Sequence, residues 1–309
     1  MLNTMKLSLG PIQYFWQRQR VLDFYQQVAD CPAEIIYLGE VICSKRRLVK
    51  PEDWLAIGRE LTQHGKQVIL SSLTLLEAAS EIASLKKLCH NDEFMVEAND
   101  ISAVQLLSTS GKSFVTGPSF NIYNGRSLEL LAKKGLKRWV LPVELGLETL
   151  RDLQAQRPDG VETEVFALGR LPLAYSARCY TARSHNLPKD DCQFKCLDYP
   201  DGSLLKTREG QEFLVLNGIQ TQSALTHQVL DQLSELRVLG VDVLRISPQH
   251  DHTLQITDIF HAVLNGAPAT QLTERLTGLL PLGACNGYLL EQPGMNFSPG
   301  AAHDAQQTA

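Results

Sequence analysis

Short apolar runs alternate with amphipathic segments along most of the chain. The apolar runs have the length of buried strands and cover residues 5–9, 34–38, 67–70, 94–98, 113–116, 138–142, 161–167 and 241–246. Apolar residues recur at helical spacing over residues 16–28, 51–64, 74–88, 101–107, 125–134, 146–154, 225–236 and 254–264. This alternation predicts parallel β-α-β units. Eight such units in about 250 residues match an α/β fold of the (β/α)8 TIM-barrel type, and a doubly wound sheet is the alternative.

One segment interrupts the alternation after the seventh predicted strand. Two runs of alternating polarity, residues 203–207 and 212–216, flank Glu209 and Gly210 and predict a β-hairpin. We therefore predict one barrel domain over residues 1–292, with an insertion at residues 170–220 that carries the hairpin. Residues 293–309 are rich in Gly, Pro, Ala and Gln, which predicts a flexible tail.

Three cysteines lie in the polar, loop-like first half of this insertion: Cys179, Cys192 and Cys196. Cysteine is usually a small buried residue, so a cluster of cysteines in polar sequence indicates a chemical role. Cys43 follows the second predicted strand and opens on the same end of the barrel, where active sites of this fold lie. Four thiolates suit either structural zinc or an iron–sulfur cluster, and the wide spacing modestly favours the cluster. Unligated thiols near the surface remain a third interpretation, and three other cysteines are interpreted as structural: Cys31, Cys89 and Cys285.

Composition narrows the class of protein. A chain with 44% hydrophobic residues can bury a full core, and a net charge of −5 gives no reason to expect a nucleic-acid partner. We see no apolar signal region near the start and no apolar run of about eighteen residues, so we expect a cytoplasmic protein without a transmembrane segment. Seven is an odd number of cysteines, which argues against a disulfide framework.

Polar residues at the predicted strand ends are candidates for a substrate pocket. They are Glu97, Asn99, Asn121, Tyr123, Glu144, Glu164 and Arg245. An ionisable side chain inside a barrel is costly unless it is paired, so we predict that Glu164 faces Arg245. For each of these residues, a helix cap or a loop hydrogen bond is an equally good explanation.

Several stretches resemble the U32 family of collagenase-like peptidases. The family signature is similar to residues 164–169 (EVFALG) and 174–179 (AYSARC). A closer resemblance is to the branch of that family that acts in oxygen-independent ubiquinone biosynthesis. It lies in residues 117–124 (GPSFNIYN), 173–183 (LAYSARCYTAR) and 216–222 (LNGIQTQ), and the likeness extends over residues 5–294.

The resemblance implies a 4Fe-4S cluster held by Cys43, Cys179, Cys192 and Cys196. It also implies a heterodimer with a UbiU-like paralogue and cooperation with a UbiT-like lipid carrier. The implied reaction is hydroxylation of a prenylated aromatic ring without molecular oxygen, with prephenate as the oxygen donor.

The chain departs from the wider family at Leu168 and Pro172, where many members carry a histidine and a further cysteine. Together with the absence of a recognisable nucleophile–base pair, these departures argue against a peptidase. The alternatives are an RNA-modifying hydroxylase and a structural subunit that carries a cluster for its partner.

Overall fold

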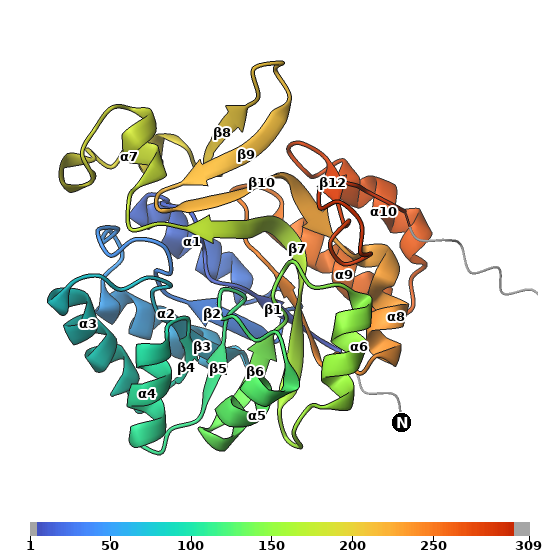
Figure 1. The fold of residues 1–309 in the computed structure, drawn as a ribbon, viewed down its shortest axis with the longest axis horizontal. Coiled ribbons are helices and arrows are strands. Elements are labelled where there is room, and N and C mark those ends of the chain that lie inside the picture. Colours follow the sequence, from blue (N-terminus) through green and yellow to red (C-terminus); the bar gives the residue numbers. More distant parts are fainter. Residues whose placement is uncertain (1–4, 300–309) are drawn as a thin grey trace, which may run out of the picture.

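Eight parallel strands form a closed barrel in the computed structural model, which describes residues 5–299 (Figure 1). The strands are β1 (Lys6–Leu9), β2 (Ile35–Leu38), β3 (Gln67–Ser71), β4 (Met95–Ala98), β5 (Phe114–Thr116), β6 (Leu136–Val140), β7 (Glu162–Tyr175) and β11 (Val243–Ile246). Strands β1 to β7 pair in sequence order, and β11 pairs with both β7 and β1, which closes the ring. The predicted (β/α)8 barrel is confirmed.

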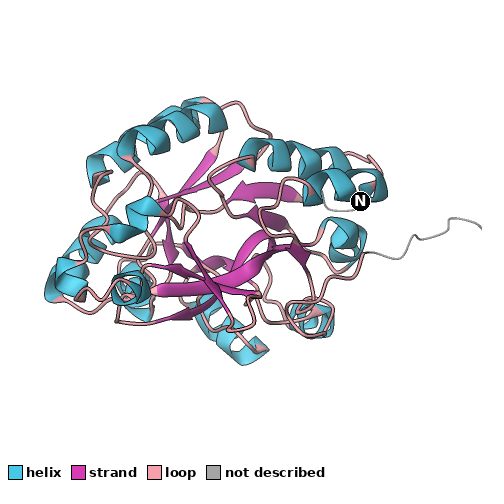
Figure 2. Cartoon of the chain, turned by 90° about the horizontal axis from the view of Figure 1, so that it is seen from above, coloured by secondary structure: helices cyan, strands magenta, loops and turns pink. Residues whose placement is uncertain are grey.

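Helices surround the ring, as Figure 2 shows from above. They are α1 (Arg18–Val28), α2 (Pro51–Gln63), α3 (Ala79–Cys89), α4 (Ile101–Thr109), α5 (Gly125–Lys133), α6 (Leu147–Ala155), α8 (Leu233–Val238), α9 (Thr253–Leu264) and α10 (Ala269–Thr277). Asp100 caps α4 by accepting a hydrogen bond from the backbone N–H of Ser102 at 2.7 Å. The structure contradicts the predicted start of α3 at Thr74. The helix begins at Ala79 because the Glu81 carboxylate accepts from the backbone N–H groups just before it.

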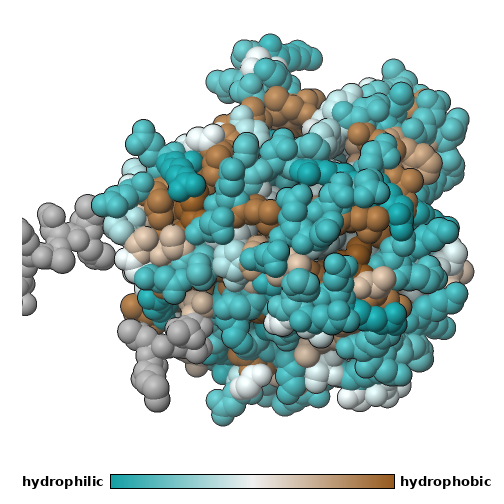
Figure 3. All heavy atoms as spheres, turned by 180° about the vertical axis from the view of Figure 1, so that it is seen from behind, coloured by the Kyte–Doolittle hydropathy of each residue, from teal (hydrophilic) through white to brown (hydrophobic). Residues whose placement is uncertain are grey.

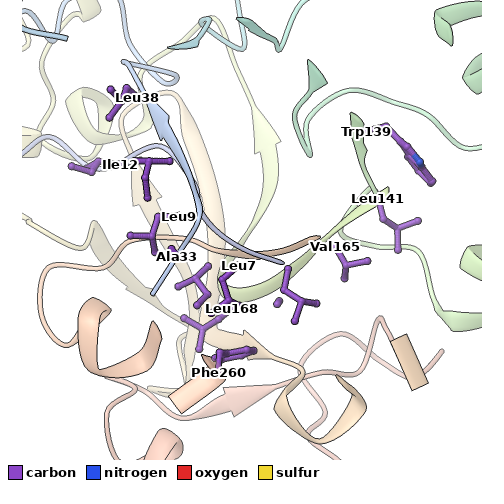
Figure 4. Packing of buried hydrophobic residues seen from close by; sticks show 14 of the residues in the cluster. Leu7, Leu9, Ile12, Ala33, Leu38, Trp139, Leu141, Val165, Leu168 and Phe260 are labelled. Carbon is purple, nitrogen blue, oxygen red and sulfur yellow. The ribbon is translucent and has the colours of Figure 1, made fainter. Parts of the chain in front are cut away.

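The barrel has two apolar layers because side chains alternate between its inside and its outside. The larger layer lies between the strands and the helices and includes Leu7, Trp139 and Phe260 (Figure 4). The smaller layer fills one end of the barrel interior and consists of Ile35, Tyr37, Ile69, Val115 and Val243, with Met95 packed against it. Several of the remaining interior positions are polar, among them Ser8, Glu97, Glu164 and Arg245.

The insertion extends the barrel sheet to one side. Strand β7 continues to Tyr175, well beyond its predicted end at residue 167, and the chain then forms α7 (Tyr180–Ser184) and two short 3-10 turns, η1 (Lys189–Asp191) and η2 (Lys195–Asp198). The predicted hairpin is observed as β8 (Ser203–Lys206) paired with β9 (Glu212–Asn217). It projects from the body of the molecule, and Figure 3 shows apolar surface near its base.

The helix predicted over residues 225–236 is wrong in its first part. Gln220–Gln228 forms β10, which pairs antiparallel with β9 and with the extended half of β7. Helical structure begins only at η3 (Leu230–Gln232) and continues into α8. The free edge of the long β7 strand recruits this segment, so strand pairing overrides the local helical spacing.

The end of the described chain is held by hydrogen bonds. A two-residue strand, β12 (Ala284–Cys285), pairs with β10. Residues 293–299 were predicted to begin a flexible tail, yet the backbone N–H of Ser298 donates to Asn286 Oδ1 at 2.9 Å and the backbone N–H of Asn286 donates to the Asn296 carbonyl at 2.9 Å. Residues 300–309 of that predicted tail lie outside the described residues. Over residues 5–299, the structure contains no helix with the length and apolar character needed to cross a membrane.

Candidate functional site

Cys43, Cys179, Cys192 and Cys196 line a single pocket of about 320 Å³. Cys43 comes from the loop between β2 and α2, and the other three come from the insertion after β7, so both contributions leave the carboxyl ends of barrel strands. All four side chains are partly buried and none forms a disulfide. The structure thus brings together the four cysteines that the sequence singled out. The three cysteines predicted to be structural, Cys31, Cys89 and Cys285, are buried elsewhere.

The thiols are spread over the wall of this cysteine pocket. The backbone N–H of Ala182 donates to Cys179 Sγ at 3.4 Å, at the start of α7. Burial raises the pKa of the Cys43 thiol to about 11, and the guanidinium of Arg46 opposes this effect. Within residues 5–299, no group of three or more His, Cys, Asp or Glu side chains has the arrangement for holding one metal ion.

One ion pair holds the Cys43 loop against the cysteine segment, and a second joins that segment to the residues before α3. Lys45 Nζ lies 2.9 Å from Asp190 Oδ1, and it also donates to the Lys189 carbonyl at 2.8 Å. Lys189 in turn pairs with Glu77, in the segment before α3. The Lys45 contacts join parts of the chain nearly 150 residues apart, so they link the Cys43 loop to the segment that carries the other three cysteines.

A second pocket, of about 340 Å³, lies at the mouth of the barrel, and three of the predicted strand-end residues line it: Glu97, Asn99 and Arg245. Arg245 is 2% exposed. Its Nε donates to Glu164 Oε1 at 2.8 Å and its Nη1 donates to Glu97 Oε1 at 2.7 Å. The predicted pairing of Glu164 with Arg245 is therefore observed, and Glu97 makes it a three-residue network.

Glu164 lies beneath this barrel-mouth pocket and is fully buried. Burial alone would raise the pKa of its carboxyl group, but the guanidiniums of Arg245 and Arg138 outweigh burial and hold that pKa below its usual range. The carboxylate also accepts from Tyr37 Oη at 2.5 Å and from the hydroxyl of Ser8. Glu164 is thus a charged support for Arg245 and does not line the pocket itself.

The other three strand-end candidates lie outside the pocket. Asn121, Tyr123 and Glu144 are exposed, and the Tyr123 hydroxyl bonds to Glu144 across the loops after β5 and β6. These loops carry their polar residues outward from the barrel axis. The structure therefore does not bring them together with Glu97, Asn99 and Arg245.

A buried polar network that the sequence did not reveal connects the two pockets. Gln13 lines the barrel-mouth pocket, and its Oε1 accepts from Gln220 Nε2 and Gln222 Nε2, each at 3.0 Å. Its backbone carbonyl accepts from Arg46 Nη1 at 2.8 Å and from Asn217 Nδ2 at 2.9 Å. Arg46 itself lines the cysteine pocket. The signal in the sequence for this network is the spacing of Gln220 and Gln222, because residues two apart in a strand lie on the same face of the sheet.

A closed ring of parallel strands with a polar pocket at their carboxyl ends defines the TIM-barrel class of proteins, whose active sites lie at this end. Residues 16–297 match the model of peptidase family U32, and the chain belongs to that family.

Three solved structures are similar to the chain at low sequence identity. The U32 peptidase Mk0906 is 11% identical, covering 80% of this chain and 94% of that one, with a TM-score of 0.46. The N-acetylneuraminate lyase (sialic acid aldolase) from Aliivibrio salmonicida is 10% identical, covering 90% and 80%, with a TM-score of 0.48. The tryptophan synthase complex from Pyrococcus furiosus gives 10% identity, 89% and 98% coverage, and a TM-score of 0.42.

Proposed function

We propose that the chain is the iron–sulfur subunit of an oxygen-independent hydroxylase that acts on aromatic-ring precursors of ubiquinone. The proposed reaction rests on a resemblance to UbiV, a member of the U32 family. This resemblance lies in residues 117–124, 173–183 and 216–222. The observation that carries the proposal is the convergence of Cys43, Cys179, Cys192 and Cys196 on one pocket.

The residues of the cysteine pocket fit a 4Fe-4S cluster. Four cysteine thiolates are its usual ligand set, and hydrogen bonds to the sulfurs are among the features that set its reduction potential. The N–H of Ala182 already supplies such a bond to Cys179. The guanidinium of Arg46, which is 5% exposed, supplies a buried positive charge beside the thiols. Positive charge of this kind favours the deprotonated thiolates that metal binding requires.

A bound cluster would supply one-electron redox chemistry at the edge of the barrel. The chain's own residues hold the cysteine loops in place through Lys45, Lys189 and Arg46. The barrel-mouth pocket is then the place for a small organic molecule, because pockets at this end of a barrel bind substrates. The Gln13 network joins the two.

The resemblance also supports the partners and the location. A UbiU-like paralogue would complete a heterodimer, a UbiT-like carrier would present the prenylated ring, prephenate would donate the oxygen, and the assembly would work in the cytoplasm.

Complementation tests this proposal directly. A ubiquinone-producing bacterium that lacks its UbiV-type subunit is grown without oxygen while it expresses this chain, and ubiquinone is measured in lipid extracts. We expect the wild-type chain and a Cys89→Ala control to restore ubiquinone, since Cys89 is buried at the end of α3 and does not line the pocket. The Cys192→Ala/Cys196→Ala double variant should restore none. Full ubiquinone with the double variant, or none with the wild-type chain, contradicts the proposal.

A further inference from the structure

Arg46 is a buried cation whose guanidinium is held in place by three separate parts of the chain. Its Nη1 donates to the backbone carbonyl of Gln13 at 2.8 Å, and its Nη2 donates to Asn217 Oδ1 at 2.8 Å. Its Cζ lies 5.6 Å from the centre of the Phe15 ring. Turning the guanidinium toward another partner would break both hydrogen bonds, so its plane is fixed.

The third nitrogen of this guanidinium is left over. Arg46 Nε is buried and has no hydrogen-bond partner within residues 5–299. A buried donor on a charged group is costly when nothing accepts from it. The Nε atom therefore indicates an acceptor that the protein's own described residues do not supply.

A tight turn brings the guanidinium to the wall of the cysteine pocket. The backbone N–H of Arg46 donates to the Cys43 carbonyl at 3.0 Å, so the two residues share one turn. Gly218 also lines this pocket, and a Cβ on it would lie only 2.8 Å from Arg46 Nη2. Below the turn, Glu40 accepts from the backbone N–H of Cys43 at 3.0 Å and lies 3.7 Å from Arg46 Nη1. The position of this cation beside Cys43 is thus built by the fold.

The other cations on the described wall of the cysteine pocket are Lys45 and Lys195, and they differ from Arg46. Both are partly exposed. Lys45 pairs with Asp190 at 2.9 Å, and Lys195 lies 3.9 Å from Asp198. Because water reaches these two ammonium groups, their charges are screened, whereas that of Arg46 is not.

A 4Fe-4S cluster on the four cysteines would supply the missing acceptor. Its sulfurs accept hydrogen bonds, and such bonds are among the features that set its reduction potential. Reduction adds one electron and makes the cluster more negative. A donor that carries positive charge therefore stabilises the reduced form more than the oxidised form.

We propose that Arg46 Nε donates a hydrogen bond to a sulfur of the cluster and thereby raises the reduction potential of that cluster. The inference rests on the proposed function, because it requires the cluster. It goes further in assigning the tuning of the potential to a residue outside the four ligands.

A redox titration of the full-length protein, purified without air and reduced with dithionite, tests this assignment. Iron and sulfide are measured first, and the Arg46→Gln variant should hold as much of both as the wild-type chain. Its reduction equilibrium, followed by EPR of the reduced cluster, should shift about tenfold toward the oxidised form. This is the factor expected for a hydrogen bond to a charged group, and it equals about 59 mV for one electron. Arg47→Gln removes the same charge at the exposed neighbouring position, so this matched control should leave the potential nearly unchanged.

Labelling of arginine with ¹⁵N separates the hydrogen bond from the charge. Pulsed EPR on the reduced wild-type cluster should detect a coupling to an arginine nitrogen. Arg46→Lys keeps the charge but has no Nε donor in this position, so it should lose the coupling. If the Arg46→Gln protein does not hold a cluster, the measurement on the labelled wild-type chain decides alone.

The outcomes distinguish failure of this inference from failure of the proposed function. An unchanged potential in Arg46→Gln at full iron content overturns the inference and leaves the iron–sulfur assignment standing. So does the absence of an arginine coupling from the wild-type cluster, which would mean that Nε faces only a water. A wild-type chain that binds no iron contradicts the proposed function, and this inference with it.

Discussion

Glu164 should be among the side chains on which the stability of this barrel depends most. Its carboxylate is fully buried, accepts hydrogen bonds from Ser8, Tyr37 and Arg245, and lies 4.0 Å from Arg138. Glu164→Ala removes the acceptor and leaves two buried guanidiniums short of negative charge. Breaking a buried pair from one side costs about 3–5 kcal/mol, so we expect the free energy of unfolding to fall by about that amount.

The matched control is another carboxylate that pairs with an arginine, but at the surface. Glu93 forms two hydrogen bonds with Arg59, at 2.7 and 2.6 Å, and both side chains are exposed. Because exposed pairs contribute little, Glu93→Ala should leave the free energy of unfolding nearly unchanged. Urea unfolding followed by circular dichroism and by tryptophan fluorescence gives both values, provided the two signals change together. Equal and small losses for the two variants would refute the view that the buried network stabilises the barrel.

Three further predictions concern other buried parts of the molecule. Gly117→Ala places a methyl group 2.0 Å from Asn99 Oδ1, so it should displace that side chain and lower the free energy of unfolding by about 1–3 kcal/mol; unchanged unfolding would contradict this. Burial lowers the pKa of His227 from 6.5 to about 4. Between these two pH values the histidine is protonated in the unfolded chain but neutral in the folded chain. Stability should therefore fall by about 3 kcal/mol as the pH drops through this window, and His227→Gln should remove that part of the pH dependence in urea titrations. Arg46→Lys removes the guanidinium that donates to two oxygen acceptors, so the free energy of unfolding should fall by about 1–3 kcal/mol. Arg47→Lys, at the exposed neighbouring position, should leave it nearly unchanged. Similar losses for the two variants would argue against a special role for Arg46.

Local sequence predicted the barrel because each unit repeats the same pattern. A parallel strand buried on both faces appears in the sequence as an apolar run, and the helix that follows has apolar residues at helical spacing. Because this pattern recurs eight times, each unit supports the same prediction. The pairing of Glu164 with Arg245 was predictable for a related reason, because a charged residue in a buried strand needs a partner. Strand β10 was missed because its partner is the second half of β7, some fifty residues away in sequence, and no local pattern encodes that pairing.

The two halves of the site differ in how far they were predictable. The cysteines stand out by residue type and by their polar surroundings, and the barrel geometry places Cys43 on the same end as the insertion. Gln13 carries no such mark, because its importance arises from contacts across the fold. Tyr123 and Glu144 were chosen by their place after a strand, but a strand end fixes only the start of a loop and not the direction in which it leads.

Chemical analysis of the protein purified without air tests the central claim most directly. The account predicts a brown protein with about four irons and four sulfides per chain, as a 4Fe-4S cluster on four thiolates requires. The Cys89→Ala control should keep this content, and Cys43→Ala should lose it, because Cys43 lines the cysteine pocket and Cys89 does not. A colourless protein with one tightly bound zinc would make the four cysteines a structural centre instead and would contradict the iron–sulfur assignment.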